Sequence, residues 1–282
     1  MGVPVVYVKT MFDDSSRPVW QRWRAWLRQV VHHRIVDCVV VSSGVMKDAL
    51  PVAGASTKVE VVPHGVDLRR FKPAPLSADV ARAKEEIGLS RDDEVVLCVA
   101  PIIKRKGLDY LASAWGRVAE HRPHARLLLV GSERPVASGR TSFGDELRRT
   151  LSRGHGDERV TFVGSVRRVE RYLSAADVFV FPSLKEGMPN VVCEAMSAGV
   201  ACVLTPFMGL PREFGRPGEQ YLLVDHDPDE IASGITSLLT DPRERERLGN
   251  GARSWVEEHL ALDVTVDLLT RIIRDLGNPR AS

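Results

Sequence analysis

The 282-residue sequence has few cysteines and aromatic residues and no long apolar run, and these shortages exclude several classes of protein. The four cysteines, Cys38, Cys98, Cys193 and Cys202, form no Cys-x-x-Cys pair, so they favour buried free thiols over a zinc site. No run approaches the roughly 20 apolar residues that span a bilayer, and the N-terminal residues lack the apolar core of a signal peptide. We therefore expect a cytoplasmic protein that is soluble or attached to a membrane only at its surface.

The balance of charges gives a second exclusion. The formal net charge is only +2, which is too close to neutral to indicate a nucleic-acid partner by itself. Hydrophobic residues make up 44% and charged residues 27% of the chain, which predicts a globular protein with a sizeable core rather than a disordered one.

Short apolar runs alternate with longer amphipathic stretches along the chain. Most of the runs are continuously apolar, as in strands that are buried on both faces of a parallel sheet. The alternation predicts a doubly wound, Rossmann-like α/β fold. The expected strands are 3–8, 36–41, 59–62, 95–99, 127–130, 160–163, 178–181, 201–204 and 221–224, and the expected helices include 108–121, 190–198, 229–239 and 243–259.

A domain boundary is expected near Pro63, where a stretch rich in turn-forming residues extends to Pro75. Six expected strands follow this stretch, enough for one complete Rossmann-like domain over residues 63–260. Only three expected strands precede it, so residues 1–62 are interpreted as part of a domain whose beginning is absent.

The segment 181–196 carries most of the chemistry, because it combines a buried strand, a tight loop and the start of a helix near Asn190. Gly187 allows a ligand to approach the backbone closely, and the free N–H groups of the helix start favour a phosphate. Glu194, about one turn inside the helix, suits a pair of ribose hydroxyls, while Glu186 in the loop suits sugar hydroxyls or positive charge near an anomeric carbon. The alternative is that both acids are solvated surface residues.

This segment resembles the Glu-x7-Glu signature of retaining glycosyltransferases of family 4, which have the GT-B fold. Other matches follow in the same order over nearly the whole chain. They are residues 61–67 with 71–73 (interdomain linker), 104–108 (a basic loop), 163–166, 174–178 and 194–199. The resemblance implies a GT-B-like α/β fold in which a C-terminal helix, residues 261–282, packs back toward the N-terminal domain.

The resemblance also implies a function, which is metal-independent transfer of a sugar, with retention, from a nucleotide diphosphate sugar to an acceptor hydroxyl. Glu186 and Lys106 are then the catalytic residues, with Lys106 on the diphosphate, and Glu194 holds the ribose. Around them, the donor would contact Gly187, Met188, Pro189, Asn190, Arg105, Gly164, Ser165 and Val166, the last three near the base. No cofactor is expected besides the nucleotide sugar, which is UDP- or GDP-linked.

Two positions depart from the family pattern. The chain has Ala100 and Pro101 where the family usually has Gly-Arg, so an arginine that would share the diphosphate with Lys106 is missing, and Lys104 or Arg105 is the candidate substitute. The segment 5–14 also lacks the histidine that the family often places near the donor sugar.

The sequence Asp225-His226-Asp227 resembles the Asp-x-Asp of metal-dependent glycosyltransferases, but it is better interpreted as structure. Asp227 is a suitable helix cap, Pro228 suits the first helical position, and Glu230 completes a capping box. No metal site is therefore predicted.

An amphipathic helix is expected over residues 18–34, where Trp20, Trp23 and Trp26 are interspersed with arginines. Basic helices with Trp lie on anionic membrane surfaces, so one interpretation is peripheral contact with the inner membrane face. The other is that the aromatic side chains pack into the N-terminal domain.

Two functions stay open at this level. One is an active transferase that acts on a glycan, a lipid or a small-molecule acceptor, in polysaccharide or glycolipid biosynthesis. The other is a non-catalytic module or inactive fragment that binds a nucleotide sugar. An oxidoreductase of the same fold class is disfavoured because no Gly-x-Gly-x-x-Gly follows an expected strand.

Overall fold

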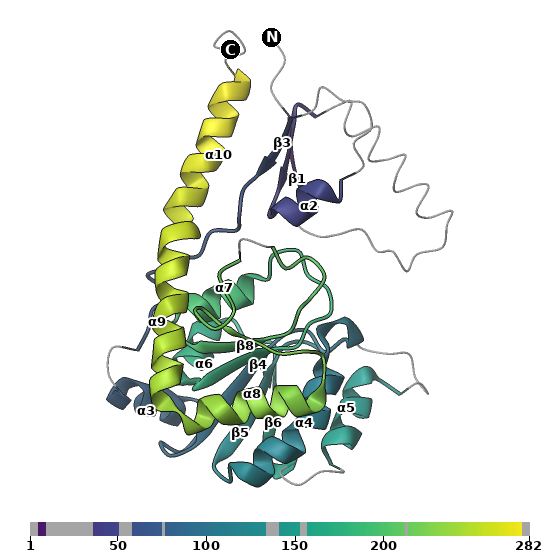
Figure 1. Ribbon diagram of the computed structural model, residues 1–282, viewed down its shortest axis with the longest axis vertical. Coiled ribbons are helices and arrows are strands. Elements are labelled where there is room, and N and C mark those ends of the chain that lie inside the picture. The colour runs from purple at the N-terminus through teal and green to yellow at the C-terminus, as the bar shows by residue number, and fades with distance from the viewer. Residues whose placement is uncertain are drawn as a thin grey trace.

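The computed structural model describes residues 5–9, 36–50, 58–74, 77–133, 141–152, 157–211 and 214–277. These residues form two parallel sheets, one of three strands and one of six, in separate parts of the molecule (Figure 1). The expected α/β architecture is therefore confirmed. The helix expected over residues 18–34 lies outside the described residues.

The larger sheet has the strand order β6-β5-β4-β7-β8-β9, and all its neighbours are parallel. The chain builds outward from β4 in one direction and then returns to build outward from β7 in the other. Loops therefore diverge between the carboxyl ends of β4 and β7, the position where open α/β sheets bind ligands. The strands are β4 (Glu94–Val99), β5 (Ala125–Val130), β6 (Val160–Gly164), β7 (Val178–Phe181), β8 (Ala201–Leu204) and β9 (Leu222–Leu223).

Helices cover both faces of this sheet (Figure 1). On one face α8 packs against α4, and on the other α9 packs against α7 and β8. The helices are α3 (Ser77–Glu86), α4 (Leu108–His121), α5 (Phe143–Leu151), α6 (Val169–Ala175), α7 (Asn190–Ser197), α8 (Pro228–Thr240) and α9 (Pro242–His259), with 3-10 turns η1 (Lys104–Lys106) and η2 (Asp157–Arg159).

The amphipathic pattern of the sequence explains this covering. The central strand β7 is buried along its whole length, and α4 buries an apolar stripe that includes Leu111, Trp115 and Val118. One continuous core results, built from residues between Val66 and Leu260.

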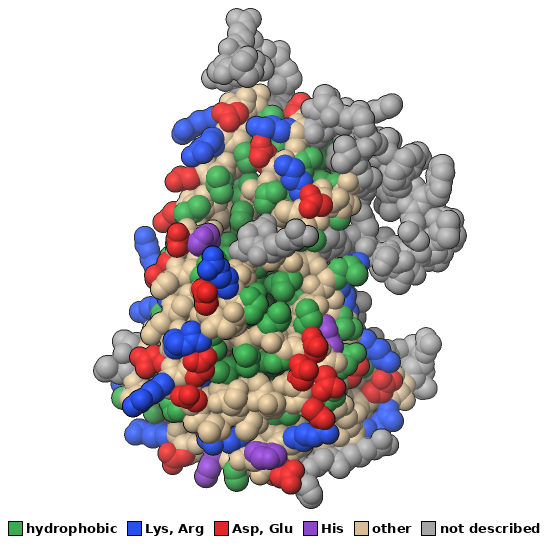
Figure 2. Space-filling model, in the orientation of Figure 1, with side chains coloured by type: hydrophobic (Ala, Val, Ile, Leu, Met, Phe, Trp, Pro, Cys, Tyr) green, Lys and Arg blue, Asp and Glu red, His purple; other side chains and the backbone are tan. Residues whose placement is uncertain are grey.

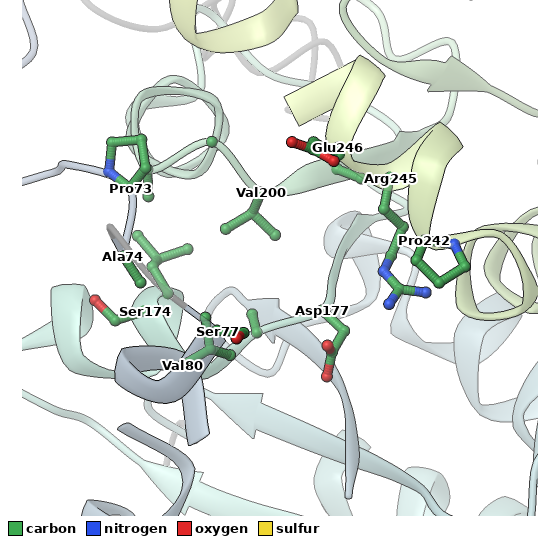
Figure 3. Close-up of a pocket in the computed structure, with 15 residues that line it drawn as sticks. Pro73, Ala74, Ser77, Val80, Ser174, Asp177, Val200, Pro242, Arg245 and Glu246 are labelled. Atoms are coloured by element: carbon green, nitrogen blue, oxygen red, sulfur yellow. The ribbon is translucent and has the colours of Figure 1, made fainter. Parts of the chain in front are cut away.

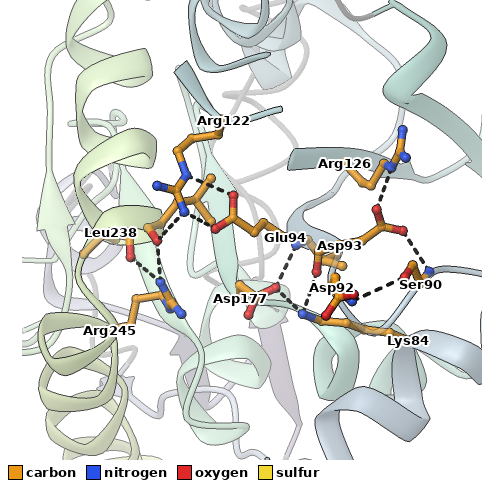
Figure 4. Close-up of polar contacts among 12 residues, drawn as sticks. Lys84, Ser90, Asp92, Asp93, Glu94, Arg122, Arg126, Asp177, Leu238 and Arg245 are labelled. Atoms are coloured by element: carbon orange, nitrogen blue, oxygen red, sulfur yellow. Dashed lines mark hydrogen bonds and ion pairs between the residues drawn. The ribbon is translucent and has the colours of Figure 1, made fainter. Parts of the chain in front are cut away.

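Charged side chains close the amino ends of the strands (Figure 4). The Nζ atom of Lys84 lies 2.7 Å from the Oδ2 atom of Asp177, and the same carboxylate oxygen accepts from the Val95 amide at 2.7 Å. The guanidinium of Arg122 pairs with Glu94 at the start of β4. The amino ends of the strands are therefore fixed by polar contacts, which leaves their carboxyl ends for a ligand.

The smaller sheet has the order β1-β2-β3 and consists of β1 (Val6–Lys9), β2 (Cys38–Val41) and β3 (Lys58–Val61), with the short helix α2 (Gly44–Asp48) after β2. Its two faces have separate apolar clusters. One joins Cys38 and Val40 to Ile272 of α10 (Leu262–Gly277), and the other contains Met46 of α2.

Helices α9 and α10 follow one another along one side of the molecule and reach from the larger sheet to the smaller one (Figure 1). Figure 2 shows hydrophobic side chains in the middle of this face, where the two parts meet, and charged side chains around them. The boundary expected at Pro63 falls between the cores of the two parts. Among the described helices, none is long and apolar enough to cross a membrane.

Several expected elements differ in their ends. Strands β2 and β4 start at Cys38 and Glu94 rather than at positions 36 and 95, and β9 keeps only two of the four residues expected. The Glu230 carboxylate bonds the amide of Asp225 at 2.9 Å, so the capping box expected with Asp227 is wrong in that detail. The Asp227 carboxylate itself does cap α8 through the amides of Asp229 and Glu230.

Candidate functional site

The loops that follow β4 and β7 are bonded to each other where the sheet changes direction. The backbone carbonyl of Arg105, in η1, accepts the Leu184 amide at 3.0 Å, and the hydroxyl oxygen of Ser183 lies 3.2 Å from it. A further loop joins from β8, because the Glu186 amide bonds the carbonyl of Met208 at 2.9 Å. Three carboxyl-end loops therefore form one connected rim.

Gly107 allows the first two of these loops to approach. Its φ of +63° is in the left-handed region, and a Cβ atom at this position would overlap the carbonyl oxygen of Pro182. Only glycine satisfies both conditions without strain. The residue thus sets the spacing between η1 and the loop after β7.

Lys106 and Glu186 meet inside this rim, although they are 80 residues apart. The Lys106 Nζ atom lies 2.7 Å from the Oε1 atom of Glu186, and both side chains are at least nine-tenths buried. The same oxygen is 3.2 Å from an Nη1 nitrogen of Arg105 and also accepts the hydroxyl of Ser183. Two cations and one carboxylate thus converge, which leaves a net positive charge at the centre of the rim.

The position of Lys106 suits an anion. Its ammonium group lies 5.2 Å from the centre of the Phe181 ring and is held over the end of β7. A buried cation interacts more strongly with a ligand charge than an exposed one, because water screens it less. Lys106 is therefore placed to bind a negatively charged group that enters between the loops.

The start of α7 adds a second feature that favours an anion. Its N-cap is Pro189, with no side-chain cap bond, and no acid occurs in its first turn. The Val192 amide already bonds the Pro189 carbonyl at 3.0 Å, so the two amides before it, those of Asn190 and Val191, are the ones open to a ligand. Gly187, Met188 and Pro189 are buried and Asn190 is exposed, which places the opening of the site at the helix start.

Glu194 lies further along α7 and is partly buried. Burial raises the pKa of its carboxyl above the usual value, Arg70 opposes that rise and Glu170 adds to it. No hydrogen bond from another described side chain occupies this carboxylate, so both oxygens can accept from a ligand. This carboxylate suits a neutral pair of hydroxyls better than a phosphate, which it would repel.

The segment 164–166 ends β6 and leads into α6. Gly164 has a φ of +77° with open space beside it, and Val166 packs against the core. Glu170, in the first turn of α6, is among the charged groups that act on Glu194. The expected base loop is thus connected to the Glu194 side of the site through α6.

The structure distinguishes between Lys104 and Arg105, the two candidate substitutes for the missing arginine. The side chain of Lys104 is 73% exposed, and its Nζ atom lies 3.5 Å from the carboxylate of Glu146. Arg105 instead points to Glu186 and to the carbonyl of Lys185. Arg105 is therefore the cation that joins Lys106.

One polar contact of the rim has no counterpart among the sequence expectations. The Nε2 atom of His226 lies 3.1 Å from the carbonyl oxygen of Ser183, and its ring lies 5.6 Å from that of Tyr110. His226 thus supports the loop after β7 from the segment before α8. The sequence Asp225-His226-Asp227 contains this histidine, but no sequence pattern pairs it with Ser183, 43 residues earlier.

Two cavities bear on where a ligand binds. One of about 420 Å³ lies at the amino ends of β7 and β8, between α3, α6 and α9, and is lined by Ser77, Asp177, Arg245 and others (Figure 3). This cavity is at the amino ends of the strands, whereas Lys106 is at the carboxyl ends. Its Asp177 is already paired with Lys84. We therefore place the candidate site at the carboxyl ends, where the cations and open amides converge.

The other cavity, of about 150 Å³, borders this site. It lies between the ends of β2 and β3 and the loop after β7, and is lined by Ser42, Ser43, Val61, Pro63, Met188, Pro211, Phe214, Trp255, His259 and Leu260. Within the described part of the chain, no group of three or more His, Cys, Asp or Glu residues could hold a metal ion.

Comparison with known sequences gives a family match and similar relatives. The sequence model of the family described as "Glycosyl transferases group 1" matches residues 93–241, just over half of the chain. A GDP-mannose-dependent monoacylated alpha-(1-6)-phosphatidylinositol monomannoside mannosyltransferase of Corynebacterium glutamicum is 29% identical over 78% of this chain and 57% of its own. A D-inositol 3-phosphate glycosyltransferase of Thermomonospora curvata is 34% identical over 76% of this chain and 51% of its own. The chain spans about half the length of the curated relatives it matches.

Solved structures resemble the whole described architecture. HepE of Anabaena, in complex with UDP and glucose, superposes with a TM-score of 0.82 at 20% identity, over 96% of this chain and 71% of its own. Sucrose-phosphate synthase of Thermosynechococcus elongatus gives a TM-score of 0.76 at 28% identity, over 97% and 68% of the two chains. The GT-B-like fold expected from the sequence is confirmed.

Proposed function

Because this chain belongs to the group 1 glycosyltransferases, we propose that it binds a nucleotide diphosphate sugar in the rim around Lys106 and transfers the sugar to an acceptor hydroxyl. The observation that supports this most is the convergence of Lys106, Arg105 and the open start of α7 at the point where the sheet changes direction. Positive charge for a diphosphate is thereby supplied by side chains and backbone amides, without a protein-bound metal ion.

The diphosphate is proposed to lie between Lys106 and the first amides of α7. Before it binds, Glu186 neutralises Lys106, so the donor must draw the ammonium group away from that carboxylate. Once the donor is bound, the positive groups are in place before the leaving group gains charge, and this lowers the barrier to its departure.

The two glutamates are proposed to hold the two ends of the donor. Glu194 accepts the ribose hydroxyls, and residues 164–166 lie near the base. Glu186, once Lys106 turns to the diphosphate, faces the sugar together with Gly187, Met188 and Pro189. Its carboxylate then bonds sugar hydroxyls or stabilises positive charge near the anomeric carbon.

The proposed reaction retains the configuration of the sugar. The bond from the anomeric carbon to the diphosphate oxygen breaks, and the bond to the acceptor oxygen forms on the same face. The acceptor proton leaves with the diphosphate. The acceptor enters from the side of the smaller sheet, past the cavity that includes Ser42, Ser43 and Met188.

The bases and acceptors of similar proteins define the substrates to test. The Corynebacterium relative is named for GDP-mannose and a phosphatidylinositol mannoside, while HepE was solved with UDP-glucose as well. We propose a UDP- or GDP-linked hexose as donor and a hydroxyl of a glycan, a lipid headgroup or a small polyol as acceptor. Contact with the surface of the inner membrane from the cytoplasmic side accompanies a lipid acceptor.

The test is release of nucleoside diphosphate from a panel of UDP- and GDP-sugars, with the anomeric configuration of the product read by NMR. Lys106→Met should abolish both binding and release, and Glu194→Gln should weaken both. The matched control is Lys104→Gln, which removes an exposed lysine of the same 3-10 turn and should leave both unchanged. An unaffected Lys106→Met variant would reject the proposed diphosphate site.

A second candidate function is a nucleotide-sugar-binding module that does not transfer sugar. The Lys106–Glu186 ion pair favours this candidate, because the pair must break before a donor can bind. Pro101 favours it as well, because it stands where the family usually has an arginine. Binding of a nucleotide sugar without any release of diphosphate, with every acceptor supplied, would select this candidate.

A further inference from the structure

Arg70 reaches from the linker between the two sheets to a helix 100 residues further along the chain. Its Nε and Nη2 atoms donate to the Oε2 atom of Glu170 at 3.2 and 3.0 Å, and Nη2 also donates to the backbone carbonyl of Arg167 at 3.3 Å. Arg167 directly follows the segment 164–166. A single guanidinium group therefore holds both the end of that loop and the first turn of α6.

The backbone that carries Arg70 is itself fixed to α7. The Oδ1 atom of Asp67 accepts the Arg70 amide at 3.1 Å, and the next residue, Phe71, is buried in the core. The Phe71 carbonyl accepts the hydroxyl of Ser197 at 2.6 Å, and Ser197 is the last residue of α7, the helix that carries Glu194. Arg70 thus links the loop after β6 to the helix of Glu194.

Charged groups from two other elements act on Glu194. They are Arg70 from the linker and Glu170 from α6, and the thiol of Cys193 is the neighbouring titratable group on α7 itself. Burial raises the pKa of the Glu194 carboxyl, and the charge of Arg70 limits that rise. Arg70 therefore favours the carboxylate form of Glu194, which is the form that accepts two hydroxyl bonds.

We propose that Arg70 is a positioning residue of the donor site, which holds residues 164–167 in a fixed relation to Glu194 so that base and ribose are bound together. The inference rests on the proposed function, because it requires a nucleotide in this site. Arg70 acts through the loop and through Glu194, and it does not contact the diphosphate.

The experiment compares Arg70→Gln with Arg168→Gln in the full chain by calorimetric titration of UDP, GDP and inorganic diphosphate. Arg168 is the matched control, because it bonds the other carboxylate oxygen of Glu170 at 3.0 Å from a position that is 70% exposed. Arg70→Gln should weaken binding of the preferred nucleotide about tenfold, as expected when charge-assisted hydrogen bonds are lost. Arg168→Gln should change it less than about twofold, and neither variant should change the affinity for inorganic diphosphate.

A pH series separates positioning from a general loss of structure. Nucleotide affinity should fall as Glu194 becomes protonated, and in Arg70→Gln that fall should begin at a higher pH than in the wild type, because a stabilising positive charge is gone. Arg70→Lys, which keeps the charge but not the paired hydrogen bonds, should restore the wild-type pH profile and only part of the affinity. It also serves as the test if Arg70→Gln does not fold.

Two results would overturn the inference alone. One is an unchanged nucleotide affinity in Arg70→Gln while the wild type binds, which leaves the proposed function intact. The other is an equal loss of affinity for inorganic diphosphate, which shows that the whole site has collapsed. A wild-type chain that binds neither UDP nor GDP overturns both this inference and the proposed function.

Discussion

Replacement of Glu186 by Gln separates the structural and the functional consequences of the Lys106–Glu186 pair. In the free protein the Glu186 carboxylate accepts from Lys106, Arg105 and Ser183 at the same oxygen. Gln keeps one carbonyl acceptor but removes the negative charge. Lys106 is then buried without a charged partner, so the variant should be less stable than the wild type.

The magnitude follows from the burial of both side chains, which are at least nine-tenths inaccessible to water. Loss of hydrogen bonds to charged groups, together with a cation left without its partner, costs about 2–4 kcal/mol of unfolding free energy. With an unfolding entropy of roughly 0.6 kcal/mol/K for a chain of this length, the melting temperature should fall by about 3–7 °C.

The effect of a ligand should have the opposite sign. A diphosphate and the Glu186 carboxylate compete for the same ammonium group, so the variant should bind a nucleoside diphosphate more tightly than the wild type. A tenfold gain in affinity would add roughly 1.4 kcal/mol to the stabilisation by saturating UDP or GDP. Transfer of sugar should nevertheless be lost, because the carboxylate no longer faces the donor sugar.

The assay is thermal unfolding with and without UDP or GDP, for the wild type, Glu186→Gln and the control Glu94→Gln. Glu94 pairs with Arg122 at the amino end of β4, whereas Glu186 lies at the carboxyl ends of the strands in the same sheet. The control should lower the melting temperature but leave the ligand-induced rise as in the wild type. An equal or smaller ligand-induced rise in Glu186→Gln would refute the competition for Lys106.

Three further predictions follow from single residues. Affinity for a nucleoside diphosphate should rise with pH through the raised pKa of the Glu194 carboxyl, because only the carboxylate accepts both hydroxyls, and Glu194→Gln should flatten that profile in titrations at several pH values. Gly107→Ala should cost roughly 3 kcal/mol of unfolding free energy in urea, since its Cβ would overlap a backbone carbonyl, whereas Gly164→Ala, with open space around it, should cost about 1 kcal/mol. Burial raises the pKa of Cys98 and Cys193 to about 12, so mass spectrometry should find neither alkylated by iodoacetamide at about pH 8 until the protein is unfolded, and labelling of the native protein would contradict their buried positions.

The sequence predicts the elements whose apolar pattern is continuous. Strands β7 and β8 and helix α4 have the expected ends, and in each the apolar run or amphipathic stripe is followed at once by a polar residue or Pro. Helix α5 is not predicted by such a pattern, since Leu147 and Leu151 are its only buried large side chains. Its signal was local, in the capping box between Ser142 and Asp145.

The site shows the limit of sequence patterns more sharply. Motifs identify Lys106, Glu186 and Glu194 separately, but the ion pair between the first two depends on β4 lying beside β7. Apolar runs predict a parallel sheet without giving the order of its strands. The contacts of His226 and Arg70 are long-range for the same reason, and only the folded chain brings their partners together.

The most direct test of the account is a crystal structure of this protein with bound UDP or GDP. We predict that the diphosphate lies within hydrogen-bond distance of Lys106 and the first amides of α7, with the ribose hydroxyls on the Glu194 carboxylate. A nucleotide bound instead in the cavity between α3 and α9, or with its phosphates away from Lys106, would contradict it.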